Sequence, residues 1–304
     1  MNQFLVVRIA RPKSKTRSSV CINRIVKTVV GGVLSMPQVR KSGTAWERRL
    51  DDYAYTKGLD RPGWAWEFLR RNASYIREVQ DNHDIIPKAT AHSSGVQVII
   101  LQQRDLLAEN WGLVASVDPK TCAGDATIFW LPSLMNSIIR CHAKASCGNH
   151  EETVNLSHFR GRKSVLVTNI YEYVVIQDSR AAARMLITGK SFLSGDSVLN
   201  FNFDGIKNAL WQLNNLRELR QLMCNSPNPV SMNWSSNTKY RDYLVALDGH
   251  LAQRSYRDIA EVLFGSDRVK EVWTNETRHL KDKVRRAVQA GIELMNGGYV
   301  KLLN

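Results

Sequence analysis

The amino-acid sequence predicts an α+β protein with an N-terminal helical segment, a β-rich middle that ends in a long helix, and a C-terminal helix-turn-helix variant. Three observations predict this class. Apolar residues recur at helical spacing between 46 and 79, short β-branched and aromatic runs follow between 96 and 203, and amphipathic helical segments fill 239–304. The length of 304 residues fits two modest domains better than one.

Residues 1–43 form a basic extension with nine Lys or Arg residues and no acid. Most of the net charge of +14 therefore lies on this tail, since the rest of the chain has 33 basic against 28 acidic residues. Such a surplus favours nucleic acid as a partner, because bound phosphates release their counterions. Three interpretations remain open: a disordered arm that touches DNA, a transit peptide, or an over-long gene model whose true start is Met36.

The next predicted domain, residues 44–82, is helical and aromatic. Asp60 can cap a helix, Pro62 fits its first turn, and Asn72 is a plausible stop. Trp64 and Trp66 are interpreted as core or interface anchors rather than base-stacking residues, because tryptophan is usually buried.

Residues 83–224 are predicted to form a β-rich domain with a closing helix. The predicted strands are 96–101, 112–117, 127–131, 164–168, 171–176, 184–188 and 198–203. Turn residues between them, such as Asp118-Pro119, indicate small antiparallel sheets. The helix begins after Asp204 and runs to about Met223. Its apolar face, which should pack on the sheet, comprises Ile206, Leu210, Leu213, Leu216 and Leu219.

A segment with two prolines among Asn, Ser and Thr residues, 225–238, is the expected linker. Beyond it, residues 239–304 carry three amphipathic segments. The first ends near Gln253, and a capping box from Ser255 to Asp258 then opens a short second helix. Gly265 stands where a left-handed residue should stop that helix. The connector 266–276 is longer than the turn between the two helices of a usual helix-turn-helix. Trp273 within it is expected to pack into the core.

The third segment, residues 277–292, has an apolar seam and an opposite basic face. Between 277 and 290, five Lys or Arg residues stand against one acid, which suits a helix in the major groove of double-stranded DNA. Arginine can also grip guanine through two hydrogen bonds. The competing interpretation is an ordinary solvated surface. The candidate DNA contacts are Ser255, Tyr256, Arg257, Arg278, Lys281, Lys283, Arg285 and Arg286.

Other chemistry finds little support in the sequence. Cys141, His142, Cys147 and His150, with His158 nearby, are the residue types that bind zinc, but their irregular spacing favours a loop over a zinc site. Phosphate-binding, dinucleotide and hydrolase motifs do not occur, so we expect neither an enzyme nor a cofactor nor a metal. The five cysteines are an odd number, and neither a signal peptide nor a membrane span is recognisable, which favours a cytoplasmic protein.

Several stretches resemble the RovC-like type VI secretion transcription factors, whose relatives regulate integrative conjugative elements. They are "YLVALDGHLAQRSYRDIAEVLFG" (243–265), "KDKVRRAVQAGIELMNGGYVKLL" (281–303) and "GRKSVLVT" (161–168). In addition, "DDYAYTKGLDRPGWAWEFLRRN" (51–72) is similar to a transcriptional-regulator-like N-terminal domain, and "WGLVASVDP" (111–119) extends the resemblance. Residues 1–43 have no counterpart in it.

The resemblance implies a variant helix-turn-helix that binds DNA and a role in transcriptional activation. Some relatives act instead as anti-activators that grip another regulator, so a protein that sequesters a transcription factor or RNA polymerase is the alternative. Helix-turn-helix proteins often dimerise on two-fold sites, and we therefore expect a homo-oligomer.

Overall fold

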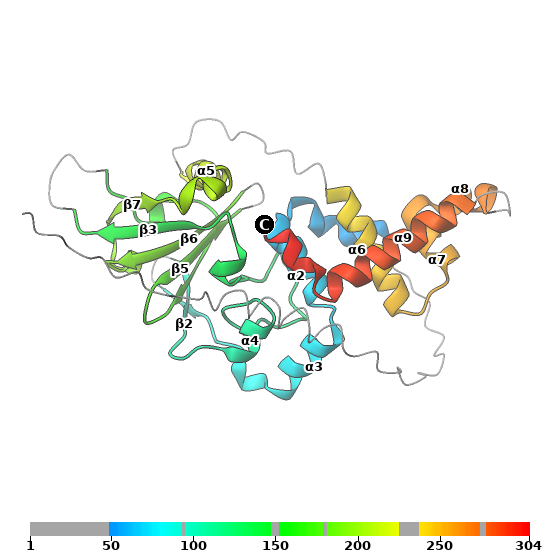
Figure 1. The fold of residues 1–304 in the computed structure, drawn as a ribbon, viewed down its shortest axis with the longest axis horizontal. Helices are drawn as coiled ribbons and strands as arrows, with labels where there is room; N and C mark the ends of the chain where they lie inside the picture. The colour runs from blue at the N-terminus through cyan, green and yellow to red at the C-terminus, as the bar shows by residue number, and fades with distance from the viewer. Residues whose placement is uncertain (1–48, 93–94, 147–151, 179–180, 225–236, 274–277) are drawn as a thin grey trace, which may run out of the picture. The chain divides into compact units, whose positions relative to one another are not determined.

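The computed structural model describes residues 49–92, 95–146, 152–178, 181–224, 237–273 and 278–304. The basic extension 1–43 and most of the expected linker lie outside the described residues. The interpretations offered for the extension therefore stay open. The α+β class is confirmed, with helices at both ends of the described chain and a sheet between them (Figure 1).

The N-terminal part consists of short helices: η1 (Leu50–Gly58), α2 (Arg61–Leu69), α3 (Ala73–Asp81) and η2 (His83–Ile85). Asp60 caps α2 as expected, and its Oδ1 accepts a hydrogen bond from the Gly63 amide at 2.7 Å. Asn72 does not simply end a helix. It is the N-cap of α3 and accepts bonds from the amides of Ser74 and Tyr75.

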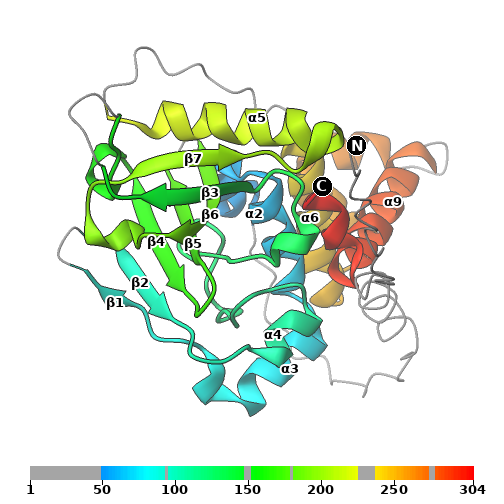
Figure 2. The same ribbon diagram turned by 60° about the vertical axis from the view of Figure 1, so that its left-hand side comes forward.

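In the described residues seven strands form one mixed sheet with the order β1-β2-β4-β5-β6-β3-β7 (Figures 1 and 2). Their bounds are β1 Thr90–Ala91, β2 Gln97–Ile100, β3 Ile139–Lys144, β4 Arg162–Val167, β5 Glu172–Gln177, β6 Ala182–Gly189 and β7 Val198–Asn202. The expectation of small antiparallel sheets is wrong, because β2 pairs parallel with β4 and β3 pairs parallel with β6. These two parallel pairs connect three antiparallel groups, β1-β2, β4-β5-β6 and β3-β7, into one sheet.

Two predicted strands, 112–117 and 127–131, form no ladder and meet only at the isolated bridge between Leu113 and Trp130. Short helices flank them: α4 (Leu106–Asn110) and η3 (Pro132–Leu134). Further along, η4 (Leu156–His158) and η5 (Phe192–Ser194) connect strands. Strand β3 was not predicted, although Ile139, Cys141 and Ala143 alternate with polar residues in the pattern of a strand with one buried face.

The sheet is covered on both faces. Leu166, Tyr173 and Leu186 point into a core shared with the N-terminal helices, and that core contains the fully buried Trp64 and Trp66. Val165, Val174 and other residues of opposite parity point into a second core beneath α5 (Gly205–Leu222). The interpretation of the two tryptophans as core anchors is confirmed.

Helix α5 has the predicted bounds but not the predicted orientation. Leu219 is buried, whereas Ile206 and Leu210 are 94% and 76% exposed. The polar Asn215 faces inward instead, because its amide nitrogen donates to the Arg184 carbonyl at 2.8 Å and its oxygen accepts from the Arg184 amide at 3.1 Å. The pairing of β6 with β3 begins at Met185, so the backbone of Arg184 has no partner in β3. The Asn215 side chain takes the place of that partner.

The C-terminal part comprises α6 (Asn237–Leu251), α7 (Tyr256–Phe264), α8 (Ser266–Val272), α9 (Arg278–Met295) and η6 (Gly298–Leu302). Leu244 and Leu247 of α6 pack into the core of the N-terminal helices, together with Tyr299 of η6. The other side of α6 packs on α7 and α9, and α8 packs on α7. The C-terminal helices and the N-terminal helices therefore share one hydrophobic core.

Candidate nucleic-acid interface

Helices α6 to α9 form a small bundle around an apolar core (Figure 1). Ala246 of α6, Ile259 of α7, Val269 of α8 and Val284 of α9 are each fully buried in it. Because the apolar seam of α9 is used for this packing, the opposite side of that helix faces solvent. The predicted seam of the third segment is thus confirmed, although the helix runs three residues further than predicted.

The N-terminus of α7 has the predicted capping box. The Ser255 hydroxyl accepts from the Asp258 amide at 3.2 Å, and the Asp258 carboxylate accepts from the Ser255 amide at 3.0 Å. Tyr256 is half-buried and packs against the bundle core. Arg257 is exposed and forms an ion pair with Glu261 at 3.2 Å. Ser255 and Arg257 are therefore both at the surface.

Helix α7 ends at Gly265, whose φ of 87° lies in the region that favours glycine. The residues after it, expected to form a long connector, fold into α8 and stop at Trp273. Trp273 is half-buried and packs against the bundle core, in agreement with its expected role. The tight helix pair is thus α7 and α8, with one glycine between them.

The predicted basic face of α9 is exposed. Lys281, Lys283, Arg285 and Arg286 all lie at the surface, and Gln289 lies among them. Arg278 is the first residue of α9, but its side chain lies outside the described residues. At 100° per residue Arg285, Arg286 and Gln289 lie on the half of the helix opposite Val284, and Lys281 and Lys283 lie at its two flanks.

One acid, Asp282, lies among these cations. An Arg285 Nη atom stands 3.3 Å from an Asp282 carboxylate oxygen, and Arg286 Nε donates to the Asp282 carbonyl at 3.3 Å. The Arg285 side chain is 66% exposed, so the pair contributes little to stability and leaves the guanidinium accessible. Lys283 lies over the Phe264 ring at 4.8 Å, which holds its ammonium between α7 and α9.

Helix α8 brings two further cations that the sequence analysis did not select, Arg268 and Lys270, both exposed. The signal for this helix was present, since Val269 and Trp273 stand four residues apart on its inner side. Asp267 and Glu271 balance the two cations within α8. Helix α9 is therefore the more basic of the two candidates.

The possible zinc cluster is not assembled by the described part of the chain. Cys141 is buried, and burial raises the pKa of its thiol to about 12, whereas His142 points to the other face of β3. Adjacent strand residues on opposite faces cannot bind one ion together. Cys147 and His150 lie outside the described residues.

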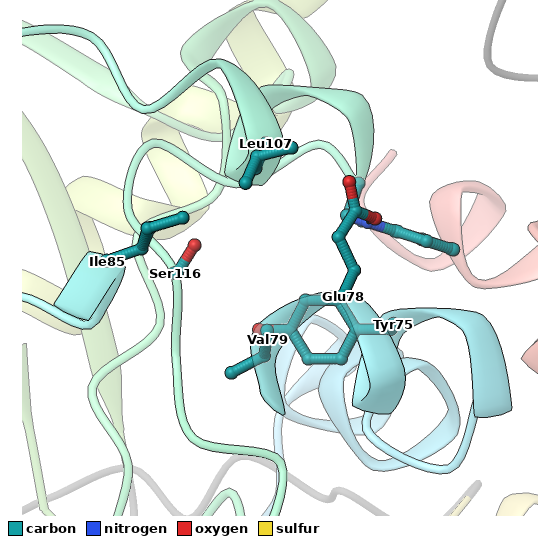
Figure 3. A pocket seen from close by; sticks show the side chains of 7 residues that line it. Tyr75, Glu78, Val79, Ile85, Leu107 and Ser116 are labelled. Carbon is teal, nitrogen blue, oxygen red and sulfur yellow. The ribbon is translucent and has the colours of Figure 1, made fainter. Parts of the chain in front are cut away.

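A small cavity lies between α3 and the segment around α4. Figure 3 shows Tyr75, Glu78 and Val79 on one side of it and Leu107 and Ser116 on the other. Its volume of about 10 Å³ is that of a single water molecule, so it does not fit an organic effector.

The comparisons with known proteins agree with this geometry. The C-terminal part of the chain, from α5 onward, matches a DNA-binding domain of transcription factors, and the N-terminal helices match a transcriptional regulator domain. The protein is therefore a transcription regulator with a DNA-binding domain.

In particular, residues 207–304 match the RovC family model described as "T6SS, Transcription factor, DNA binding domain". Residues 45–114 match the model described as "Proteobacterial transcriptional regulator-like domain". Both resemblances expected from the sequence are confirmed. No curated protein matches the chain. Among the described residues, no helix is both long and apolar enough to span a membrane.

Proposed function

We propose that this protein is a sequence-specific DNA-binding activator of secretion or mobile-element transfer genes, acting in the bacterial cytoplasm. The observation that carries the proposal is the exposed basic face of α9, which lies within the segment matched to a DNA-binding domain. A helix of 18 residues, held along one side by a bundle and basic on the other, suits insertion into the major groove.

Charge favours α9 over α8 as the helix that enters the groove. Between residues 281 and 289 of α9, Lys281, Lys283, Arg285 and Arg286 stand against one acid, Asp282, and the exposed Glu293 further along the helix is paired with Lys301. In α8, two cations are matched by two acids, which gives no net attraction to phosphate. In our proposal Arg285 and Arg286 reach base edges or phosphates, and Lys281 and Lys283 contact the two flanking backbones.

The N-terminus of α7 supplies a second contact in this proposal. The first amides of a helix have no partner inside the helix, and Tyr256 and Arg257 occupy that position in α7. Together with the exposed Ser255 hydroxyl, these groups can hold one phosphate. Asp258 and Glu261 lie close by, so this contact should be weaker than those of α9.

The alternative, an anti-activator that sequesters another regulator, drew on the aromatic N-terminal helices. Trp64, Trp66 and Phe68 are fully buried, so they offer no surface to a partner. The expected contacts with RNA polymerase would have to use other residues.

Crosslinking and immunoprecipitation from cells, followed by sequencing, tests the proposal. We expect a small set of enriched promoters and reduced expression of the genes behind them when the chain is deleted. The Arg285→Ala/Arg286→Ala variant should lose the enrichment, whereas Arg268→Ala/Lys270→Ala in α8 should keep it. Recovery of a protein partner after nuclease treatment, with no DNA enriched, would favour the anti-activator instead.

A further inference from the structure

A groove of about 720 Å³ lies between β7 and α5. Nine of the twelve residues that line it are apolar, among them Leu199 and Phe201 of β7 and Leu213 and Leu216 of α5. Figure 2 shows α5 running alongside β7. A volume of this size falls within the range of about 300–1,000 Å³ that is typical of small-molecule sites, which are also mostly apolar.

The groove reaches down to the second core. Its lining includes Phe159 and Leu219, which are 2% and 4% exposed and belong to that core. Phe201 points to the same face of the sheet, because it pairs with Cys141 of β3, which also lies in that core. At the mouth of the groove, Phe201 and Leu213 remain 36% and 49% exposed. An apolar occupant would remove both side chains from water, which is favourable.

Two arginines lie at the mouth of the groove. Leu213, Arg217 and Arg220 follow one another at four- and three-residue spacing, so they lie along one line of α5. Arg217 and Arg220 are exposed, and neither has an ion-pair partner within the described residues. Among the described residues that line the groove, Glu152 is the one acid. The charge at the mouth is therefore positive overall and attracts an anionic group.

The lining also has a definite length. On the side of α5 it extends from Leu213 to Met223, which is about 15 Å of helix at the usual rise per residue. An acyl chain of medium length matches this distance. Because such a chain carries no hydrogen-bonding groups, it leaves no polar atom unsatisfied against the apolar side chains.

We propose that this groove binds a free fatty acid of medium chain length. The methylenes of the fatty acid pack against Leu199, Leu216 and Phe159, and its carboxylate binds Arg217 and Arg220 at the mouth. This inference does not depend on the proposed function.

Isothermal titration calorimetry of the full chain with dodecanoate, below the critical micelle concentration, tests the proposal. We expect saturable binding of one dodecanoate per chain. Decanoate is two methylenes shorter and should bind about ten-fold more weakly, because each buried methylene contributes a factor of about two to four. The absence of saturable binding, or the binding of several molecules per chain, would overturn the proposal.

The role of the arginines is tested with a charged and an uncharged ligand. Arg217→Ala/Arg220→Ala should bind dodecanoate about five-fold more weakly and should bind decanol as the wild type does, because only the carboxylate pairs with arginine. Arg268→Ala/Lys270→Ala removes the same charge from α8 and should leave both affinities unchanged. Equal dodecanoate affinity in the wild type and the Arg217→Ala/Arg220→Ala variant would contradict the proposed carboxylate site.

A carboxylate at the mouth of the groove should exclude the ligand. Leu213→Glu should weaken dodecanoate binding by at least about ten-fold, since it repels the anion and removes an apolar contact. Its circular dichroism spectrum should not change, because Leu213 is half exposed. Ile170→Glu is the matched control, since Ile170 is 73% exposed in the β4–β5 turn, and it should bind as the wild type does. A Leu213→Glu variant with wild-type affinity would place the ligand elsewhere and overturn the proposal.

A photoreactive fatty acid locates the site directly. Dodecanoate that carries a diazirine near its methyl end should label residues 198–201 or 213–223 on irradiation, and an excess of unlabelled dodecanoate should suppress the label. Labelling confined to other segments of the chain would overturn the proposal.

Discussion

Arg71 and Asp248 form a bidentate ion pair. It joins the two parts of the chain that match family models, residues 45–114 and 207–304. Arg71 Nε donates to Asp248 Oδ1 at 2.5 Å, and Nη2 donates to Oδ2 at 3.0 Å. The Tyr53 hydroxyl donates to the same carboxylate at 2.8 Å, and Arg71 also binds the buried Glu67. Burial disfavours the charged guanidinium, but Asp248 and Glu67 outweigh it and hold the pKa of Arg71 well above its usual value. The N-terminal helices therefore fix α6, the helix on which the bundle rests.

Removal of this carboxylate should destabilise the whole chain. Asp248→Ala leaves Arg71 buried with an incomplete set of partners, which should lower the free energy of unfolding by about 3–5 kcal/mol. Urea denaturation measures the change. The exposed pair of Lys301 and Glu293 is the control, and Lys301→Ala should cost less than about 1 kcal/mol. Equal losses in the two variants would show that Arg71 finds other compensation.

The crossing of α6 and α9 should depend on Gly291. A Cβ atom at this position would lie 2.7 Å from the Tyr243 carbonyl oxygen and 2.9 Å from Leu247 Cβ, so the helices would have to move apart. Alanine gains about 1 kcal/mol over glycine in helix propensity, but overpacking costs about 1–3 kcal/mol. We expect Gly291→Ala to lower the unfolding temperature, whereas the exposed Gln289→Ala should not. A more stable Gly291→Ala variant would contradict the close crossing.

Stability should fall as the pH rises through neutrality because of Glu218 on α5. Burial, and then the charge of Asp60, raise the pKa of this carboxyl to about 7, against the opposing effect of Arg184 and the Ala182 amide. The folded chain thus holds a proton that the unfolded chain releases near pH 4.5. The contribution of this group is complete below that pH and is lost as the pH rises through about 7, by at most about 3 kcal/mol. Urea midpoints between pH 5 and 8 measure it.

The Glu218→Gln variant is the control for this titration. It should flatten the fall in the urea midpoint, since glutamine carries no proton to lose. A variant that keeps the full slope would show that other groups cause it.

Asp282 should weaken DNA binding from within the basic face of α9. Its carboxylate repels phosphate and competes for Arg285, and an exposed pair of this kind is worth about 0.2–1 kcal/mol. Asp282→Asn should therefore bind an enriched genomic fragment about two- to five-fold more tightly in a gel-shift assay at low salt. Asp267→Asn in α8, where the acid is 94% exposed, should change the affinity less. Weaker binding by Asp282→Asn would mean that this carboxylate supports the contact.

The local signals of the sequence predicted much of the C-terminal bundle. The capping box of Ser255 and Asp258, the stop at Gly265 and the seam of α9 are all present, because caps and helical periodicity act over a few residues. Helix α8 was missed because its seven residues are too few to show a helical period, although Val269 and Trp273 stand four residues apart on its inner side. Whether the exposed cations contact DNA stays a prediction.

The sheet shows where local signals fail. Strand order is decided by contacts between distant segments. No local sequence signal therefore predicts the parallel pairings of β2 with β4 and of β3 with β6. The orientation of α5 was predicted wrongly for a similar reason. Asn215 faces inward because Arg184, 31 residues away, needs a backbone partner.

Binding of a fluorescent fragment, chosen from the enriched promoters and measured by anisotropy over a range of salt concentrations, tests the central claim most directly. If α9 contacts phosphates through Arg285 and Arg286, the double alanine variant should bind at least about ten-fold more weakly. Its slope of log K against log salt should be flatter by about 0.9 for each lost contact. Arg268→Ala/Lys270→Ala should keep the wild-type slope. Unchanged affinity and slope in the Arg285→Ala/Arg286→Ala variant would contradict the claim.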